Sequence, residues 1–172
     1  MKEGCEICAE LEKNDVVYED DKVVAMLDHN PVTTGHLIVT TKDHFPIMEQ
    51  VPDYLIDHLF RIVNTVSISL FELLKVQGTN MIVNNGIAAG QEHAHFMVNI
   101  IPRSENDKID FQWQPKQLNE EEMSTVELAL KEETKTIGTF EKEEEKPIQL
   151  EESEKLHVDE DSYLMKQLRR IP

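Results

Sequence analysis

The chain of 172 residues carries 34 acidic and 17 basic side chains, which gives a formal charge of −17. This balance argues against a nucleic-acid or anionic-membrane binder, because phosphate contacts need lysine and arginine, although a small nucleotide needs only a local pocket. The first residues form no apolar stretch of signal-peptide length, and no apolar run reaches the roughly 18 residues of a membrane span. We therefore expect a cytoplasmic protein of one domain with an appendage.

The charge is unevenly distributed along the chain. Residues 1–103 hold 15 acidic and 7 basic residues, whereas residues 104–172 hold 19 and 10. Within residues 141–161, 10 of 21 are aspartate or glutamate, which predicts a solvated or disordered segment. We predict a compact domain over residues 1–103 and an acidic, partly helical extension over residues 104–172. Its last residues, 162–172, mix apolar side chains with arginines and are typical of a segment that docks on this domain or on a protein partner.

The first predicted elements are a hairpin, a strand and a long helix. Residues 16–28 hold two β-rich runs around a charged turn, and residues 36–41 form another apolar, β-branched run. From Asp53 onward the apolar residues follow helical spacing, and Gly78 is expected to end that helix.

Two strands and a second helix follow. Residues 79–83 predict a strand, and residues 92–101 predict the last strand of the domain, which Pro102 would stop. Asn119 precedes three glutamates and can cap a helix, since acidic side chains stabilise the positive end of the helix dipole.

The last predicted strand carries two different faces. Alternate positions 94, 96, 98 and 100 are apolar and predict a core face. The opposite face would present His93, His95, Met97 and Asn99. Two histidines at this spacing suit a metal or acid–base site, or they lie on an ordinary solvent-facing strand. The preceding loop, residues 84–90, holds two glycines that permit positive φ, so its N–H groups can converge on an anion.

The only two cysteines are Cys5 and Cys8, which excludes a disulfide scaffold. A CxxC pair is typical of a redox site or of half a zinc site. The redox interpretation expects a βαβ pattern that is missing here. Zinc needs two further ligands, preferably imidazoles. The residues leave open which of seven histidines would serve: His29, His36, His44, His58, His93, His95 and His157.

Five segments in order resemble the histidine triad (HIT) family. They are the CxxC, DHNP at 28–31, GHLIVTTKDH at 35–44, NNGIAAGQ at 84–91 and IIPR at 100–103. The resemblance implies an α+β HIT fold, in which a curved antiparallel sheet packs on a long helix. It also implies a homodimer and the binding of a purine nucleotide.

The catalytic motif of the family departs from its pattern in this chain. The family uses three alternating histidines, the middle one attacking phosphorus. Without gaps these positions hold His95, Met97 and Asn99, and a thioether cannot form the nucleotidyl intermediate. The resemblance therefore implies a pseudoenzyme without catalytic residues. A shift of two residues gives the alternative, an active nucleotide hydrolase or nucleotidyltransferase that uses His93 or His95. A third interpretation is a purely structural or protein-interaction module.

The resemblance also assigns a metal site and a nucleotide site. In zinc-containing HIT proteins, a CxxC pair binds structural zinc with two histidines, and those positions here are Cys5, Cys8, His44 and His95. The nucleotide positions are Asp28 at the ribose, Ile7 and His29 near the base, Asn84, Gly90 and Gln91 at the phosphate, and Met97 and Asn99 at the pocket floor. Glu92 stands where the family usually has serine or threonine, and an acid beside phosphate is unfavourable. Asp28 is equally interpretable as a turn residue.

Overall fold

The computed structural model describes residues 4–11 and 15–138, and every structural statement below concerns these residues. The acidic run at 141–161, the predicted docking segment at 162–172 and His157 lie outside them. No helix among the described residues is both long and apolar enough to cross a membrane.

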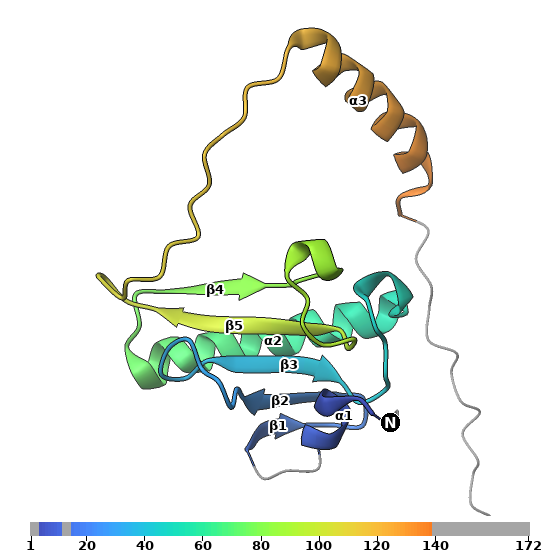
Figure 1. Ribbon diagram of the computed structural model, residues 1–172. Coiled ribbons are helices and arrows are strands. Elements are labelled where there is room, and N and C mark those ends of the chain that lie inside the picture. Colours follow the sequence, from blue (N-terminus) through green and yellow to red (C-terminus); the bar gives the residue numbers. More distant parts are fainter. Residues whose placement is uncertain (1–3, 12–14, 139–172) are drawn as a thin grey trace, which may run out of the picture. The chain divides into compact units, whose positions relative to one another are not determined.

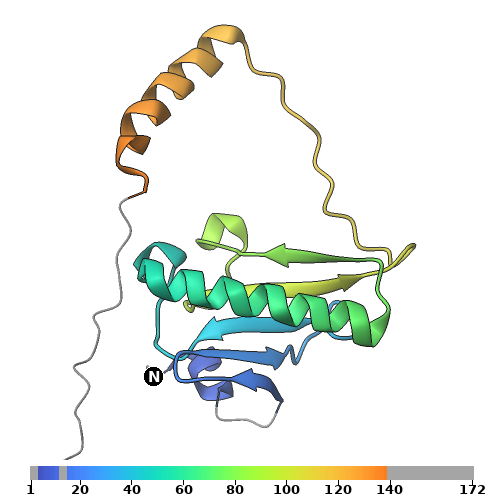
Figure 2. The same cartoon turned by 180° about the vertical axis from the view of Figure 1, so that it is seen from behind.

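The domain is built on a five-stranded antiparallel sheet with the strand order β1-β2-β3-β5-β4. The strands are β1 Val16–Glu19, β2 Val23–Leu27, β3 Leu37–Thr41, β4 Gly78–Ile82 and β5 Met97–Arg103. The long helix α2, Asp53–Leu74, covers one face of the sheet, as Figure 2 shows, and the short helix α1, Glu6–Glu10, lies at the other face (Figure 1). The predicted α+β arrangement is therefore present.

The two faces of the sheet follow the period-two alternation of its strands. Ala25 and Val39 belong to the main core, which α2 closes with buried residues such as Leu59. Their neighbours Met26 and Ile38 point to the opposite face. There they form a small second core with Ile7 of α1. The two helices therefore pack against opposite faces of the same sheet, α2 on the main core and α1 on the smaller one.

The last strand differs from its prediction at both ends. It begins at Met97 rather than at residue 92, because the N–H of Phe96 donates to Phe45 O, at 2.6 Å, and the N–H of His95 turns back to His93 O, at 2.8 Å. Residues 92–95 therefore form a turn, and Ala94 is exposed rather than in the core. The strand also continues through Pro102. Its pairing with β3 ends at Ile100, so the missing proline N–H costs no bond to that neighbour.

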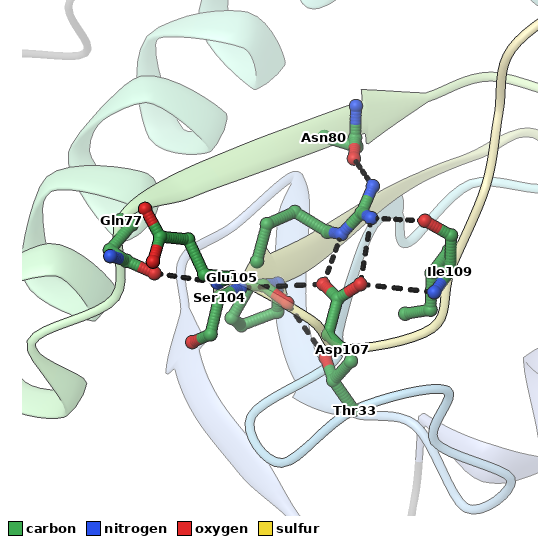
Figure 3. Close-up of polar contacts among 9 residues, drawn as sticks. Thr33, Gln77, Asn80, Ser104, Glu105, Asp107 and Ile109 are labelled. Atoms are coloured by element: carbon green, nitrogen blue, oxygen red, sulfur yellow. Dashed lines mark hydrogen bonds and ion pairs between the residues drawn. The ribbon is translucent and has the colours of Figure 1, made fainter.

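The chain leaves the sheet through a network of polar contacts that includes Asn80, Asp107 and Ile109 (Figure 3). Arg103 is the donor at its centre. The guanidinium donates to both carboxylate oxygens of Asp107, at 2.6 and 2.9 Å, and to Asn80 Oδ1 and Ile109 O, each at 2.5 Å. The guanidinium also holds the pKa of Asp107 far below its ordinary range, with the N–H of Ile109 acting in the same direction. This clamp fixes the direction of the chain just beyond the sheet.

The predicted helix in the extension is present as α3, Glu120–Glu133. Its capping box is complete, because Asn119 Oδ1 accepts from the Glu122 N–H and Glu122 Oε2 accepts from the Asn119 N–H. An α-helix thus begins directly after the predicted cap residue, Asn119. The first long helix ends at Leu74, four residues before the predicted stop, with Lys75 in the left-handed conformation.

Candidate metal centre

Two cysteines and two histidines converge at one end of the sheet. Cys5 is the N-cap of α1 and Cys8 lies within it, while His44 follows β3 and His95 precedes β5. Because β3 and β5 are antiparallel neighbours, the end of one and the start of the other lie at the same sheet end as α1 (Figure 1). The four potential ligand atoms all lie within 4.8 Å of one another.

The distances in this cluster suit a tetrahedral zinc ion. Nδ1 of His95 lies 3.5 Å from the sulfur of Cys5 and 3.5 Å from that of Cys8, and Nδ1 of His44 lies 3.5 Å from the sulfur of Cys8. A sulfur and a nitrogen on one tetrahedral zinc lie about 3.6 Å apart, given bonds of about 2.3 and 2.05 Å. The imidazole rings meet edge to face, with centroids 5.0 Å apart. The cluster can therefore hold a metal, and its donors are those of a closed Cys₂His₂ set.

His95 has the tautomer that a metal ligand needs. The side chain is fully buried, and its Nε2 lies 3.1 Å from the carbonyl oxygen of Thr41. A carbonyl only accepts, so Nε2 carries the hydrogen and the lone pair of Nδ1 points at the two sulfurs. Burial lowers the pKa of His95 and the neighbouring His44 adds to the decrease, although the bond to Thr41 opposes it, so the fold favours the neutral ring. A neutral imidazole oriented by a carbonyl is ready to coordinate.

Burial disfavours the thiolate form of Cys5 in the absence of a metal. Burial raises the pKa of the Cys5 thiol, and the adjacent Cys8 side chain adds to the increase. No disulfide joins the two cysteines. A bound divalent cation would take the thiolate forms and release their protons, which ties metal binding to the folding of this end of the chain.

At the other end of β3, Asp28 and His36 form a line of polar contacts that ends at Asn99. Asp28 Oδ1 accepts from the Asn30 N–H at 2.7 Å, and its Oδ2 lies 3.2 Å from Nδ1 of His36. Nε2 of the buried His36 lies 3.2 Å from Asn99 Oδ1. The sequence placed His36 only among seven candidate zinc ligands. His36 directly follows Gly35, whose φ is +85°. A glycine at this place was the available sequence signal that the chain changes direction and turns the His36 side chain inward as β3 begins.

The glycine loop has the predicted positive φ angles, +92° at Gly86 and +82° at Gly90. Its polar groups are bonded to one another, however. The Gly86 N–H donates to Gln91 Oε1 at 2.7 Å, the Gly90 N–H donates to Ile87 O, and Asn84 Nδ2 donates to Gly90 O. Gln91 Nε2 donates to Pro46 O and His93 O. Phosphate binding by Asn84, Gly90 and Gln91 stays a prediction.

The remaining predicted residues lie in two environments. Ile7 is buried beside Met26 and Ile38, with the partly buried Met97 against the same cluster. His29 is exposed, and its Nδ1 lies 3.6 Å from an oxygen of Asp15. Their roles at a nucleotide base or pocket floor stay predictions.

The HIT domain family matches residues 10–106, more than half of the chain, so the chain belongs to the HIT family. Over 94 residues it is 40% identical to an uncharacterized HIT-like protein of Methanocaldococcus jannaschii, a match that covers 54% of this chain and 70% of that protein. Over 91 residues it is 36% identical to adenylylsulfatase HINT3 of Arabidopsis thaliana, covering 53% of this chain and 46% of the plant protein. The chain thus spans less than half of that relative.

Solved structures confirm the predicted HIT fold. A HIT family protein from Bacillus subtilis has a TM-score of 0.70 and 28% identity, over 76% of this chain and 96% of that one. A zinc-bound histidine triad family protein from Mycobacterium smegmatis has a TM-score of 0.59 and 27% identity, over 75% of this chain and 94% of that one. The metal in that neighbour agrees with a metal-competent cluster here.

Proposed function

We propose that the protein is a zinc-stabilised HIT-fold protein that binds a purine nucleotide and lacks nucleotidyl-histidine catalysis. Met97 carries this proposal, because it is partly buried in β5 between the other two triad positions and offers a thioether where a nucleophile is required. The residue that takes the first triad position, His95, has Nε2 bound to Thr41 and Nδ1 directed at the two sulfurs. Neither of its nitrogens is placed to serve a substrate.

The zinc part of the proposal is supported by the donor set at Cys5, Cys8, His44 and His95. Each ligand of a closed Cys₂His₂ site comes from the protein, so the metal activates no water and its role is structural. Metal analysis of protein purified without chelators should give one zinc per chain. Well under one zinc per chain would contradict this part.

The nucleotide part is supported by Asp28. Its carboxylate accepts one backbone N–H and lies beside the buried His36, which leaves lone pairs free for ribose hydroxyls. Calorimetry with AMP and GMP tests it, and Asp28→Asn keeps the oxygen that caps the turn while removing the charge. We expect the variant to bind about 10- to 100-fold more weakly, the effect of losing hydrogen bonds to a charged group. Absence of heat with both nucleotides would favour a purely structural or interaction protein.

The assembly and the extension complete the proposal. The outer side of α2 exposes Phe60, Ile68 and Phe71, and β4 is an edge strand that exposes Met81. Exposed apolar side chains beside an open sheet edge favour a homodimer through this surface. Light scattering of the wild type and of Ile68→Lys tests it, and a monomeric wild type would contradict it.

We propose further that the domain ends at residue 103, that the extension over residues 104–172 contacts a protein partner, and that the protein works in the cytoplasm.

A second candidate function is supported by the plant relative. That protein is named an adenylylsulfatase, which is a nucleotide hydrolase. In this chain the acid–base group would be His93, whose ring is partly exposed and borders a pocket. Turnover of adenosine phosphoramidate, a dinucleoside polyphosphate or adenylyl sulfate that His93→Ala abolishes would establish this function in place of the first.

A further inference from the structure

A pocket of about 290 Å³ leads from the surface to the candidate metal centre. One wall is formed by the start of α1 and the other by the turn before β5, and the lining includes two of the four ligand residues. The lining residues are Gly4, Cys5, Glu6, His44, Glu92, His93 and Ala94. A cation or a competing chelator that approaches from this side therefore meets Cys5 and His44 first.

One polar contact joins the two walls of this pocket. Nδ1 of His93 lies 3.1 Å from Oε2 of Glu6. The two groups therefore lie within ion-pair distance. Glu6 is the first residue of α1, immediately after Cys5, and His93 lies two residues before His95. The contact therefore spans the mouth of the pocket and ties the cysteine-bearing helix to the segment that carries His95.

Helix α1 depends on such attachments. It has five residues, and its N-cap, Cys5, makes no side-chain hydrogen bond to the helix. Isolated helices of this length are unstable in water. Ile7 and Cys8 anchor its inner side by burial, while the Glu6–His93 contact lies on its outer side, where the Glu6 side chain is 76% exposed and that of His93 is 36% exposed.

We propose that the Glu6–His93 contact is a strap across this pocket that slows the exchange of metal at the cluster. This inference rests on the proposed zinc site and assigns the metal-exchange route to the pocket side. Loss of the metal requires α1 to move away from His44 and His95, or a chelator to enter between the walls. Both movements separate Glu6 from His93, so the contact opposes each of them.

The expected effect is modest, because the two side chains are partly in water. Exposed ion pairs of this kind change equilibria by a factor of about two to five, and we expect zinc release to accelerate by that factor when either partner is removed. The stoichiometry should stay at one zinc per chain, since neither side chain is one of the four ligand residues.

Zinc release from the loaded full-length protein to an excess of a chromogenic chelator, followed by stopped flow, tests the strap. The variants are Glu6→Gln, His93→Gln and the double variant. Glu92→Gln is the matched control, since it removes one negative charge from the same pocket lining and leaves the Glu6–His93 contact in place. Circular dichroism and metal analysis establish that each variant is folded and loaded.

We expect Glu6→Gln and His93→Gln each to release zinc about two to five times faster than the wild type. The double variant should be no faster than the faster single variant, because the two residues act through one contact, and Glu92→Gln should match the wild type. Three results would overturn the strap while leaving the zinc site intact. They are unchanged release in both single variants, independent effects in the double variant, and equal acceleration by Glu92→Gln. A wild type that takes up no zinc overturns the site and the strap together.

Discussion

Removing the metal should release α1 from the sheet while the rest of the domain stays folded. Ordering the backbone of its five residues costs about 5 to 10 kcal/mol. Burial of Ile7, 2% exposed, contributes about 1.5 to 3 kcal/mol, and burial of the smaller Cys8 side chain adds about 1 kcal/mol. The backbone bonds from Ala9 to Cys5 and from Leu11 to Ile7 add about 1 kcal/mol each. These terms leave the metal-free helix short by a few kcal/mol, and a deficit of about 2 kcal/mol keeps it docked in only a few per cent of molecules.

Hydrogen exchange read by mass spectrometry measures this directly. The amides of Ala9 and Leu11, which donate to carbonyls of α1 and its cap, should be protected in the zinc-loaded protein and should exchange close to the unstructured rate after chelation. Amides in the middle of α2, whose inner side is buried in the main core, provide the internal control and should stay protected in both states. Cys8→Ser measured with zinc present should reproduce the chelated pattern. Equal protection of these two amides with and without metal would refute the reasoning.

Three further predictions concern the core, the hairpin turn and the polar line. Leu59→Ala, at a fully buried position in α2, should lower the free energy of unfolding by about 2 to 5 kcal/mol in urea titrations, and a change below 1 kcal/mol would contradict its place in the core. Partial burial alone would raise the pKa of Asp20, but hydrogen bonds from the N–H groups of Lys22 and Val23 lower it to about 2. Because the folded pKa lies below the unfolded value, this stabilisation is present above about pH 4 and is lost as the pH falls through about 2. The gap between wild type and Asp20→Asn, about 1 to 2 kcal/mol at pH 5, should therefore narrow as the pH falls toward 2 and close below it, and a constant gap would contradict the assignment. His36→Ala should weaken AMP binding in calorimetry, since it removes the buried neighbour of the Asp28 carboxylate, and unchanged affinity would separate His36 from the nucleotide site.

Local signals in the sequence were sufficient for most elements. Strand β2 and the start of α2 at Asp53 match the predictions, and Asn119 caps a helix through the expected box, because alternation, helical spacing and caps depend on neighbouring residues. The predicted start of β5 was wrong because it depends on a residue that is distant in the sequence. Period-two alternation cannot distinguish a strand from a turn whose shape depends on a distant partner, here the bond from Phe96 N–H to Phe45 O.

The metal ligands show the same limit. Residue chemistry identified the cysteine pair but left seven histidines, and the family resemblance rather than spacing selected His44 and His95. What brings these two together is the pairing of Thr40 with Met97, a contact across more than fifty residues. The polar line through His36 was missed because its partner Asn99 lies on a strand far along the chain. Both the metal ligands and the contacts of His36 are therefore brought together by pairing between strands that are distant in the sequence. Sequence periodicity does not encode this pairing.

We propose that this HIT domain keeps its metal ligands while Met97 replaces the nucleophile. Intact mass spectrometry of the zinc-loaded protein, quenched during incubation with adenosine phosphoramidate, tests it most directly. Without a histidine at position 97, no covalent nucleotidyl-protein should form, and AMP should not be released above a protein-free blank. A mass increase of one adenylyl group that disappears in His93→Ala, together with AMP release, would contradict the claim and identify His93 as the nucleophile.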